Sequence, residues 1–276
     1  MNSLTAHYAT LVLPHCDVHT LYRFRRTCRG MRDHCDTDMD TWRAVAHSQF
    51  NLGCVIGSGA RGMPLLDVQR MCVENAMNCS NCDCRITNVV VVGNFNQRLD
   101  IYGDVAAVVR ANSVASSGIT ITSTGNNTSW NAFTVAGLRV ELFTNGRFIV
   151  TGGHSSLVAH AVVNFFRRFL IDTQLLALDT AAPIIIVQNV VAACKLPFST
   201  VFTVLSNVVD SDDLPFDIIK SSWDVPFIQV RMRSSGVIAN IFSERMVVAG
   251  ANSVEKTASA YSAICVALTT LLTTGE

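Results

Sequence analysis

Two stretches of the chain, LFTNGRFIVTGG at residues 142–153 and IFSERMVVAGA at residues 241–251, follow the same plan. Each runs from an apolar residue and a phenylalanine through a short polar turn into a second apolar strand and a glycine. Asn-Gly between two strand-like runs predicts a β-hairpin at the first stretch, because both residues tolerate a positive φ. Phe143 recurs as Phe242, 99 positions later. A hairpin repeated at this spacing predicts a domain made of two similar halves.

The segments around the two hairpins also recur in the same order. In the first half we expect a strand, a helix, a strand, the hairpin and an amphipathic helix at residues 85–95, 100–113, 118–124, 133–153 and 155–171. In the second half we expect the same order at residues 183–194, 197–209, 226–234, 236–251 and 253–272. The polar stretch GNNTSWN, residues 125–131, is predicted to be a loop. The predicted divisions of the chain are residues 1–50, 51–84, 85–177 and 178–276.

Composition narrows the class of protein. The chain has 276 residues, of which 49% are hydrophobic, and its 21 Lys and Arg residues balance its 21 Asp and Glu residues. This composition favours a globular fold over long disorder, and zero net charge argues against a general binder of polyanions. The start of the chain lacks the pattern of a signal peptide, and no stretch has the length of apolar residues that a membrane span needs. We expect an intracellular protein of the nucleus or cytoplasm.

Cysteines cluster before the first half, at Cys72, Cys79, Cys82 and Cys84. Ten cysteines in a chain without a secretory signal are expected to be reduced. A structural zinc site would need two clean Cys-x2-Cys pairs, and this cluster has one pair with irregular neighbours. Free thiols are therefore favoured over a zinc site, and we expect no metal.

No catalytic motif stands out in the chain. The glycine-rich stretch GSGARG, residues 57–62, lacks the Lys-Ser/Thr ending of a phosphate-binding loop and follows no clear strand. Neither G-x-S-x-G nor H-E-x-x-H occurs. We expect a protein that is not an enzyme and has no cofactor.

The repeated segments resemble the TATA-box-binding protein family over residues 85–274. The stretches that carry the resemblance are ITNVVVVGNF, LFTNGRFIVTGG, VQNVVAACKLPF, PFIQVRMR and IFSERMVVAGA. The resemblance implies an α+β fold, a duplicated saddle whose curved antiparallel sheet carries helices on its convex face. It also implies a divergent transcription initiation factor that binds A·T-rich double-stranded DNA in the minor groove through the concave face. The partners implied are general transcription initiation factors.

The resemblance also assigns roles to single residues. Asn88 and Asn189 match paired asparagines that hydrogen-bond base acceptors, while Phe143 and Phe242 match phenylalanines that wedge between base steps. Wedging of this kind, for which TATA-box-binding protein is itself the standard example, kinks the duplex. The DNA-binding residues implied are Asn88, Val90, Phe143, Ile149, Thr151, Asn189, Val191, Phe227, Phe242 and Val247.

Several positions depart from the family pattern. In the second half a wedge phenylalanine aligns with Val225, and Phe227 two positions later is expected to replace it. In the first half Phe133 lies beyond an extra loop, off the matching position. Glu141 and Asn240 stand where the family has apolar contacts with the groove. A carboxylate that faces phosphates and base acceptors is unfavourable. These departures keep open an alternative in which the saddle binds protein.

The first fifty residues resemble an F-box, a small all-α module that docks on a Skp-type adaptor of a ubiquitin ligase. The resemblance rests on D-x-x-x-L, R-x-T-C-R and a later D-x-W-R-like stretch. The apolar anchors that it implies are Leu11, Leu13, Leu21, Phe24 and Trp42. The alternative function is therefore an F-box adaptor that recruits targets to a ubiquitin ligase. This combination would suit a large DNA virus, in which case the protein belongs in the viral factory, or a divergent protist.

Overall fold

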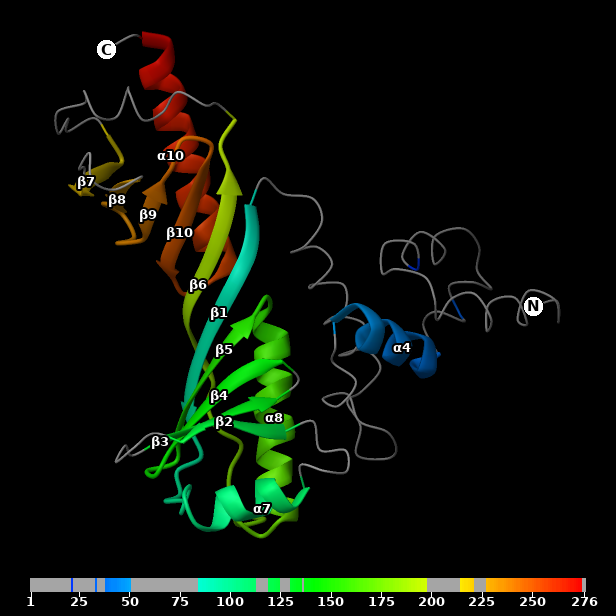
Figure 1. Ribbon diagram of the computed structural model, residues 1–276. Coiled ribbons are helices and arrows are strands. Elements are labelled where there is room, and N and C mark those ends of the chain that lie inside the picture. Colours follow the sequence, from blue (N-terminus) through cyan, green and yellow to red (C-terminus); the bar gives the residue numbers. More distant parts are fainter. Residues whose placement is uncertain are drawn as a thin grey trace, which may run out of the picture. The chain divides into compact units, whose positions relative to one another are not determined.

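The structure is a computed structural model of the chain, and it describes residues 21, 33, 38–50, 84–112, 119–124, 130–135, 137–197, 214–220 and 227–274. The chain forms two compact units (Figure 1). Unit 1 consists of Met1–Met77 and Val92–Ile185, and unit 2 consists of Asn78–Val91 and Ile186–Glu276. Ten strands are hydrogen-bonded in the order β2-β3-β4-β5-β1-β6-β10-β9-β8-β7. Every strand pair whose register is described is antiparallel.

The two units contain the same succession of strands. Unit 1 holds α4 (Met39–Phe50), the end of β1 (Cys84–Asn94), α7 (Asp104–Asn112), β2 (Ile119–Thr124), β3 (Trp130–Val135), β4 (Leu138–Phe143), β5 (Arg147–Gly153) and α8 (Ser156–Asp172). Unit 2 holds the start of β1, β6 (Ile186–Lys195), β7 (Phe216–Lys220), β8 (Ile228–Met232), β9 (Ile238–Ile241), β10 (Arg245–Ala251) and α10 (Val254–Thr274). The α+β class is confirmed, with a large antiparallel sheet and a few helices.

The predicted strands were too few, because β3 and β7 were not recognised as separate strands. Trp130 and Asn131 were assigned to a polar loop, yet they begin β3. Asn131 is fully buried, and its Nδ2 donates to the backbone oxygen of Ile101 at 2.7 Å. This long-range hydrogen bond satisfies the Nδ2 end of the buried amide, whereas Oδ1 is buried without a partner among the described residues. Local polarity cannot indicate such a bond. The expected helix at residues 197–209 lies, apart from Pro197, outside the described residues.

The first hairpin is confirmed, but its turn differs from the expected one. The turn between β4 and β5 has three residues and closes with the N–H of Gly146 donating to the oxygen of Phe143 at 2.9 Å. Only Gly146 takes a positive φ, of 82°, and a Cβ there would collide with the backbone oxygen of Gln97. Asn145 instead accepts the N–H of Arg147 at 3.1 Å. A three-residue loop that ends in a left-handed glycine has this geometry.

Strands of both units bury one face and leave the other half-buried or exposed. In unit 1, β4 and β5 alternate in this way, and α8 packs on the buried side through Phe166, whose ring lies 5.4 Å from that of Phe133 in β3. The helix begins as predicted after Ser155, whose side chain accepts the N–H of Leu157 at 3.2 Å. In unit 2, α10 buries Ile264 and Leu268 and packs on β10 and β6. The α7 helix begins at Asp104, one of the two aspartates, with Asp100, that were expected near its start.

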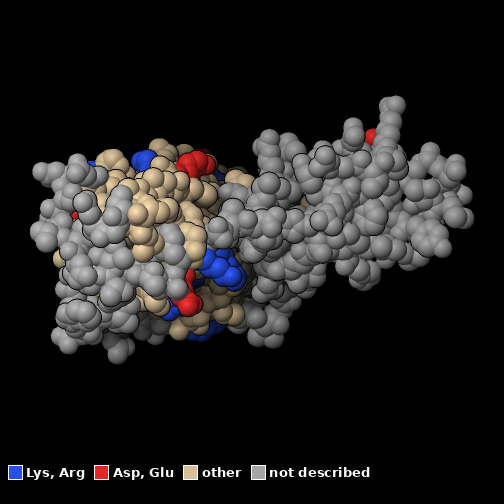
Figure 2. All heavy atoms as spheres, turned by 90° about the horizontal axis from the view of Figure 1, so that it is seen from above, with Lys and Arg blue, Asp and Glu red and all other residues tan. Residues whose placement is uncertain are grey.

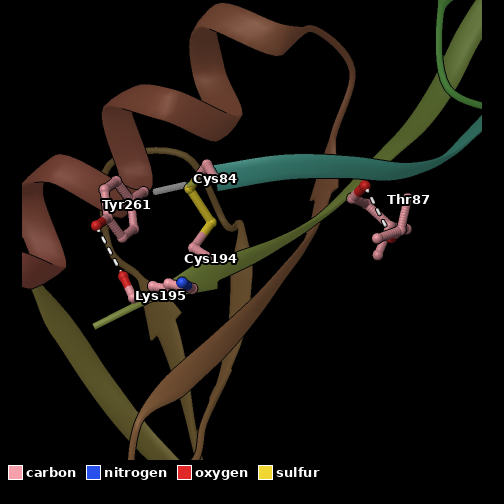
Figure 3. Close-up of a disulfide and its surroundings, with 6 residues drawn as sticks. Cys84, Thr87, Cys194, Lys195 and Tyr261 are labelled. Atoms are coloured by element: carbon pink, nitrogen blue, oxygen red, sulfur yellow. Dashed lines mark hydrogen bonds between the residues drawn. A yellow bond between two sulfur atoms is a disulfide. The ribbon is translucent and has the colours of Figure 1, made fainter. Parts of the chain in front are cut away.

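A disulfide joins the first strand of each half within unit 2 (Figure 3). Cys84 at the start of β1 bonds Cys194 near the end of β6, across 110 residues of sequence. Close by, Tyr261 of α10 donates to the backbone oxygen of Lys195 at 2.9 Å. Our expectation that all cysteines are reduced is therefore wrong for this pair. The neighbouring positions of β1 and β6 bring the two residues together, and no local spacing reveals that.

Two predictions for the N-terminal part fall partly outside the described residues. Of the five F-box anchors, Leu21 and Trp42 are described and both are buried. The other three are Leu11, Leu13 and Phe24, and they lie outside the described residues, as do Cys72, Cys79 and Cys82. Among the residues that are described, no group of three or more His, Cys, Asp and Glu side chains is placed to hold a metal ion. Nor does any helix of that part of the chain have the length and apolar character to cross a membrane.

Candidate nucleic-acid interface

The face of the strands that points away from the helices carries all the residues predicted to contact DNA. Each of them is half-buried, whereas the residues before and after it on its strand are mostly in the core. On β4 and β5, for example, Glu141 lies opposite Ile149, and Arg139 lies opposite Thr151. On β9 and β10, Asn240 lies opposite Val247. We call this side of each unit its open face.

In unit 1 the open face holds a pair of large aromatic residues that sequence reasoning found only in part. Trp130 begins β3 and lies directly opposite Phe143, the last residue of β4. Phe133 belongs to the opposite side, where it is fully buried. Trp130 was missed because its segment was taken for a loop. The alternation of a strand would have indicated it, because Trp130 and Phe133 are an odd number of residues apart and so face opposite sides.

In unit 2 the open face holds a second aromatic pair at the corresponding end of its strands. Phe227 comes just before β8 and Phe242 just after β9, and their ring centroids are 5.6 Å apart at an interplanar angle of 50°. Phe227 therefore lies beside Phe242, at the place expected of a replacement for a second wedge. A tilted arrangement at this distance is favourable for two rings, but their outer surfaces remain large and apolar.

Each aromatic pair is accompanied by an arginine. The guanidinium carbon of Arg139 lies 5.7 Å from the ring centroid of Trp130, and that of Arg245 lies 5.0 Å from the ring of Phe242. Guanidinium groups are attracted to ring faces at these distances. Positive charge is thus present next to the rings, although the chain as a whole is neutral.

The two predicted asparagines lie on the central strands of the sheet. Asn189 of β6 accepts the N–H of Gly250 through Oδ1 at 2.7 Å, and Gly250 holds a φ of 90°. Because the oxygen is held by a backbone donor, the Nδ2 end of the amide is the end that can donate to another acceptor. Asn88 of β1 is half-buried in the same way, and Gly152 has a φ of 93° that matches that of Gly250.

Two hydrogen-bonded polar pairs lie among the apolar residues of the open faces. In unit 1, Nε of Arg139 lies 2.9 Å from Oε1 of Glu141. In unit 2, Nε2 of Gln229 donates to Oδ1 of Asn240 at 2.8 Å. Glu141 therefore does not carry an uncompensated charge. In the view of Figure 2, charged side chains of both signs are scattered over a described surface that is mostly uncharged.

This arrangement suits a ligand that is flat and rich in hydrogen-bond acceptors. The aromatic pairs offer faces for stacking, the asparagine of β6 offers a donor, and the valines of β1, β6 and β10 supply apolar contact. The minor groove of DNA presents such acceptors, and proteins that bind there combine amide and arginine donors with apolar wedges.

Comparison with known proteins supports the fold. By sequence, the chain matches no protein family and no curated protein. Among solved structures, it is similar to one described as Methanococcus jannaschii TBP, with a TM-score of 0.51 and 19% sequence identity. The match covers 67% of this chain and 98% of that one. At this identity the likeness shows the fold alone.

Proposed function

We propose that this protein is a divergent TATA-box-binding-protein-like factor that binds double-stranded DNA in the minor groove. The observation that supports this most strongly is the pair of aromatic residues on the open face of each unit, Trp130 with Phe143 and Phe227 with Phe242. These rings are half-buried, and a partner would cover the apolar surface that they leave accessible. In this proposal the ring pair of each unit wedges between base steps, and the two units are copies of one ancestral half.

The central residues of the open faces then contact the groove floor. Asn88 and Asn189 donate to base acceptors, and Val90, Val191 and Val247 provide apolar contact. Few basic residues are available to neutralise phosphates, so we expect a shallow dependence of affinity on salt. The biological role that follows is transcription initiation, with general initiation factors bound on the helices α8 and α10.

The experiment that tests this function is a titration of fluorescent duplexes with the full chain at low and moderate salt. The wild type is compared with Trp130→Ala/Phe143→Ala and with Phe227→Ala/Phe242→Ala. We expect preference for an A·T-rich over a G·C-rich duplex, and a loss of about tenfold or more for each double variant, since stacking on one aromatic residue contributes about 1–3 kcal/mol. Leu178→Ala, which removes an exposed apolar side chain outside the strands, serves as the control. Equal binding by all four proteins would refute the wedge mechanism.

A second candidate is an F-box adaptor that binds a target protein on the open faces. It is favoured by the carboxylate of Glu141 on that surface and by the neutral charge of the chain. Here the first fifty residues dock on a Skp-type adaptor through Leu11, Leu13, Leu21, Phe24 and Trp42. Co-purification of the full chain with a purified Skp-type adaptor, together with failure to bind either duplex, would favour this candidate over DNA binding.

A further inference from the structure

One member of each polar pair, Glu141 in unit 1 and Asn240 in unit 2, occupies a corresponding position on its strand. Glu141 lies opposite Ile149 in unit 1, and Asn240 lies opposite Val247 in unit 2. In each unit the polar residue is two positions before the phenylalanine that follows it on the chain, Phe143 or Phe242. Each pair therefore lies within reach of whatever the adjacent aromatic pair binds. The two units differ in that one presents a carboxylate and the other a pair of amides.

The groove floor that these residues would meet differs between the two kinds of base pair. In the minor groove, A·T and T·A pairs present only acceptors, while a G·C pair adds the N2 amine of guanine, which is a donor. An ionised carboxylate can only accept hydrogen bonds. Glu141 is therefore repelled by an A·T pair beneath it and matched by the amine of a G·C pair.

The surroundings of Glu141 hold the carboxylate in position. Its Oε1 is bound to Nε of Arg139 at 2.9 Å, and the side chain of Glu141 is 24% exposed. Arg139 is in turn held over the ring of Trp130 at 5.7 Å. The neighbouring guanidinium pairs with Oε1 alone, and Oε2 is left to accept a further hydrogen bond. Arg139 still has other N–H groups that can donate to the acceptors next to the amine.

The pair of amides in unit 2 favours neither kind of base pair. Nε2 of Gln229 donates to Oδ1 of Asn240 at 2.8 Å, which leaves one acceptor, Oε1 of Gln229, and one donor group, Nδ2 of Asn240. A pair that offers both a donor and an acceptor can adapt to either kind of base pair. Any preference for guanine should therefore come from unit 1.

We propose that Glu141 is a specificity-determining residue that accepts a hydrogen bond from the N2 amine of guanine. The preferred DNA site is then asymmetric, with a G·C pair beneath unit 1 in an otherwise A·T-rich sequence. This inference rests on the proposed minor-groove function and specifies the ligand of that same face.

The test adds or removes the amine without changing the rest of the duplex. A single G·C pair is moved one position at a time through an A·T-rich duplex, and each duplex is compared with its inosine·C counterpart, which lacks the amine. Diaminopurine·T, which adds the amine to an A·T pair, completes the set. We expect one position at which the amine strengthens binding by about tenfold, as for a hydrogen bond to a charged group, with both G·C and diaminopurine·T.

Variants assign the effect to one residue. Glu141→Leu should bring the ratio of affinities with and without the amine to one, while Glu141→Gln, which keeps an acceptor, should retain part of it. Asn240→Leu, the matched change in unit 2, should leave the ratio unchanged. Binding to DNA without any position that responds to the amine, or a response that survives in Glu141→Leu, would overturn the role of Glu141 and leave the proposed function standing. Failure to bind any duplex would overturn both.

Discussion

The two units follow one strand order with different residues in their cores. In unit 1, Phe133 of β3 lies opposite Val140 and packs on Phe166 of α8. At the corresponding place in unit 2, Val230 of β8 lies opposite Ala239. Both places are fully buried. The strand order therefore depends on the alternation of apolar and polar residues, while the volume that each core needs is supplied by different residues.

The cores of the two units differ in the size of their buried side chains, and their open faces differ in charge. Unit 1 presents the ion pair of Arg139 with Glu141, and unit 2 presents the amides of Gln229 and Asn240. The aromatic pairs next to them are alike in position. Two units with one fold can thus share a general mode of contact and still discriminate between ligands at corresponding positions.

The largest effect on the free energy of unfolding is expected from a substitution in the core of unit 1. Phe133→Ala removes a fully buried ring and should lower the free energy of unfolding by about 3–5 kcal/mol. Val230→Ala, the matched change in unit 2, removes two methyl groups and should cost clearly less. Urea unfolding of both variants measures the difference. Equal losses would mean that the two cores depend equally on these positions, against the contrast in size drawn above.

Much of this architecture was accessible from the sequence because it is encoded locally. The helix at residues 155–171 was predicted from its amphipathic run. The first hairpin was predicted from its Asn-Gly turn and the second from its likeness to the first. The start of β3 was not, because Trp130 and Asn131 follow a polar stretch. Their strand conformation depends on pairing with β4, and the burial of Asn131 depends on a bond to Ile101, thirty positions earlier.

The residues of the candidate site that repeat identically in the two halves were predicted from the sequence, and the others were predicted only in part. Phe143 and Phe242 were found because two hairpins show the same residue at the same place. Trp130 was missed because its counterpart in unit 2, Phe227, is a different aromatic residue that lies just before β8. The ion pair of Glu141 could not be foreseen either, because it needs the side chain of Arg139 to lie along the same strand face.

The disulfide gives a second way to compare the stability of the two units, because it lies in unit 2. Cys84→Ser should lower the free energy of unfolding by about 2–4 kcal/mol, since a cross-link that closes a loop of 110 residues restricts the unfolded chain. Dithiothreitol should have the same effect on the wild type and none on the variant. Cys265→Ser, which changes a cysteine of α10 outside the disulfide, is the control and should stay close to the wild type. A variant as stable as the wild type would show that the pair adds nothing to unit 2.

Substitutions at two glycines test whether the units share a backbone conformation as well as an order of strands. Gly152 and Gly250 hold φ values of 93° and 90°, and a Cβ at either would have room. Replacement by alanine should therefore cost strain alone, about 1–2 kcal/mol at each site. Thermal unfolding of Gly152→Ala and Gly250→Ala should give similar shifts. A markedly larger loss at one site than at the other would mean that the two backbones differ there.

The smallest expected difference in stability comes from the starts of the two long helices. The first turn of α8 has no acidic residue, whereas that of α10 has Glu255. Hydrogen bonds to this carboxylate from its own backbone N–H and from Ser253 hold the pKa of Glu255 below its ordinary value. A carboxyl whose pKa is lowered in the folded state stabilises that state above its unfolded pKa. The contribution is lost as the pH falls through the lowered pKa.

The expected size is small because Glu255 is exposed and its interactions are screened by solvent. We expect Glu255→Gln to lower the free energy of unfolding by about 0.3 kcal/mol at neutral pH and low salt, and by nothing in acid. Urea midpoints of the variant and the wild type, measured from neutral to acidic pH, should therefore converge as the pH falls. Added salt should shrink the difference at neutral pH. A gap that stays constant with pH would mean that the glutamate acts through packing or helix propensity, and that charge does not distinguish the start of α10 from that of α8.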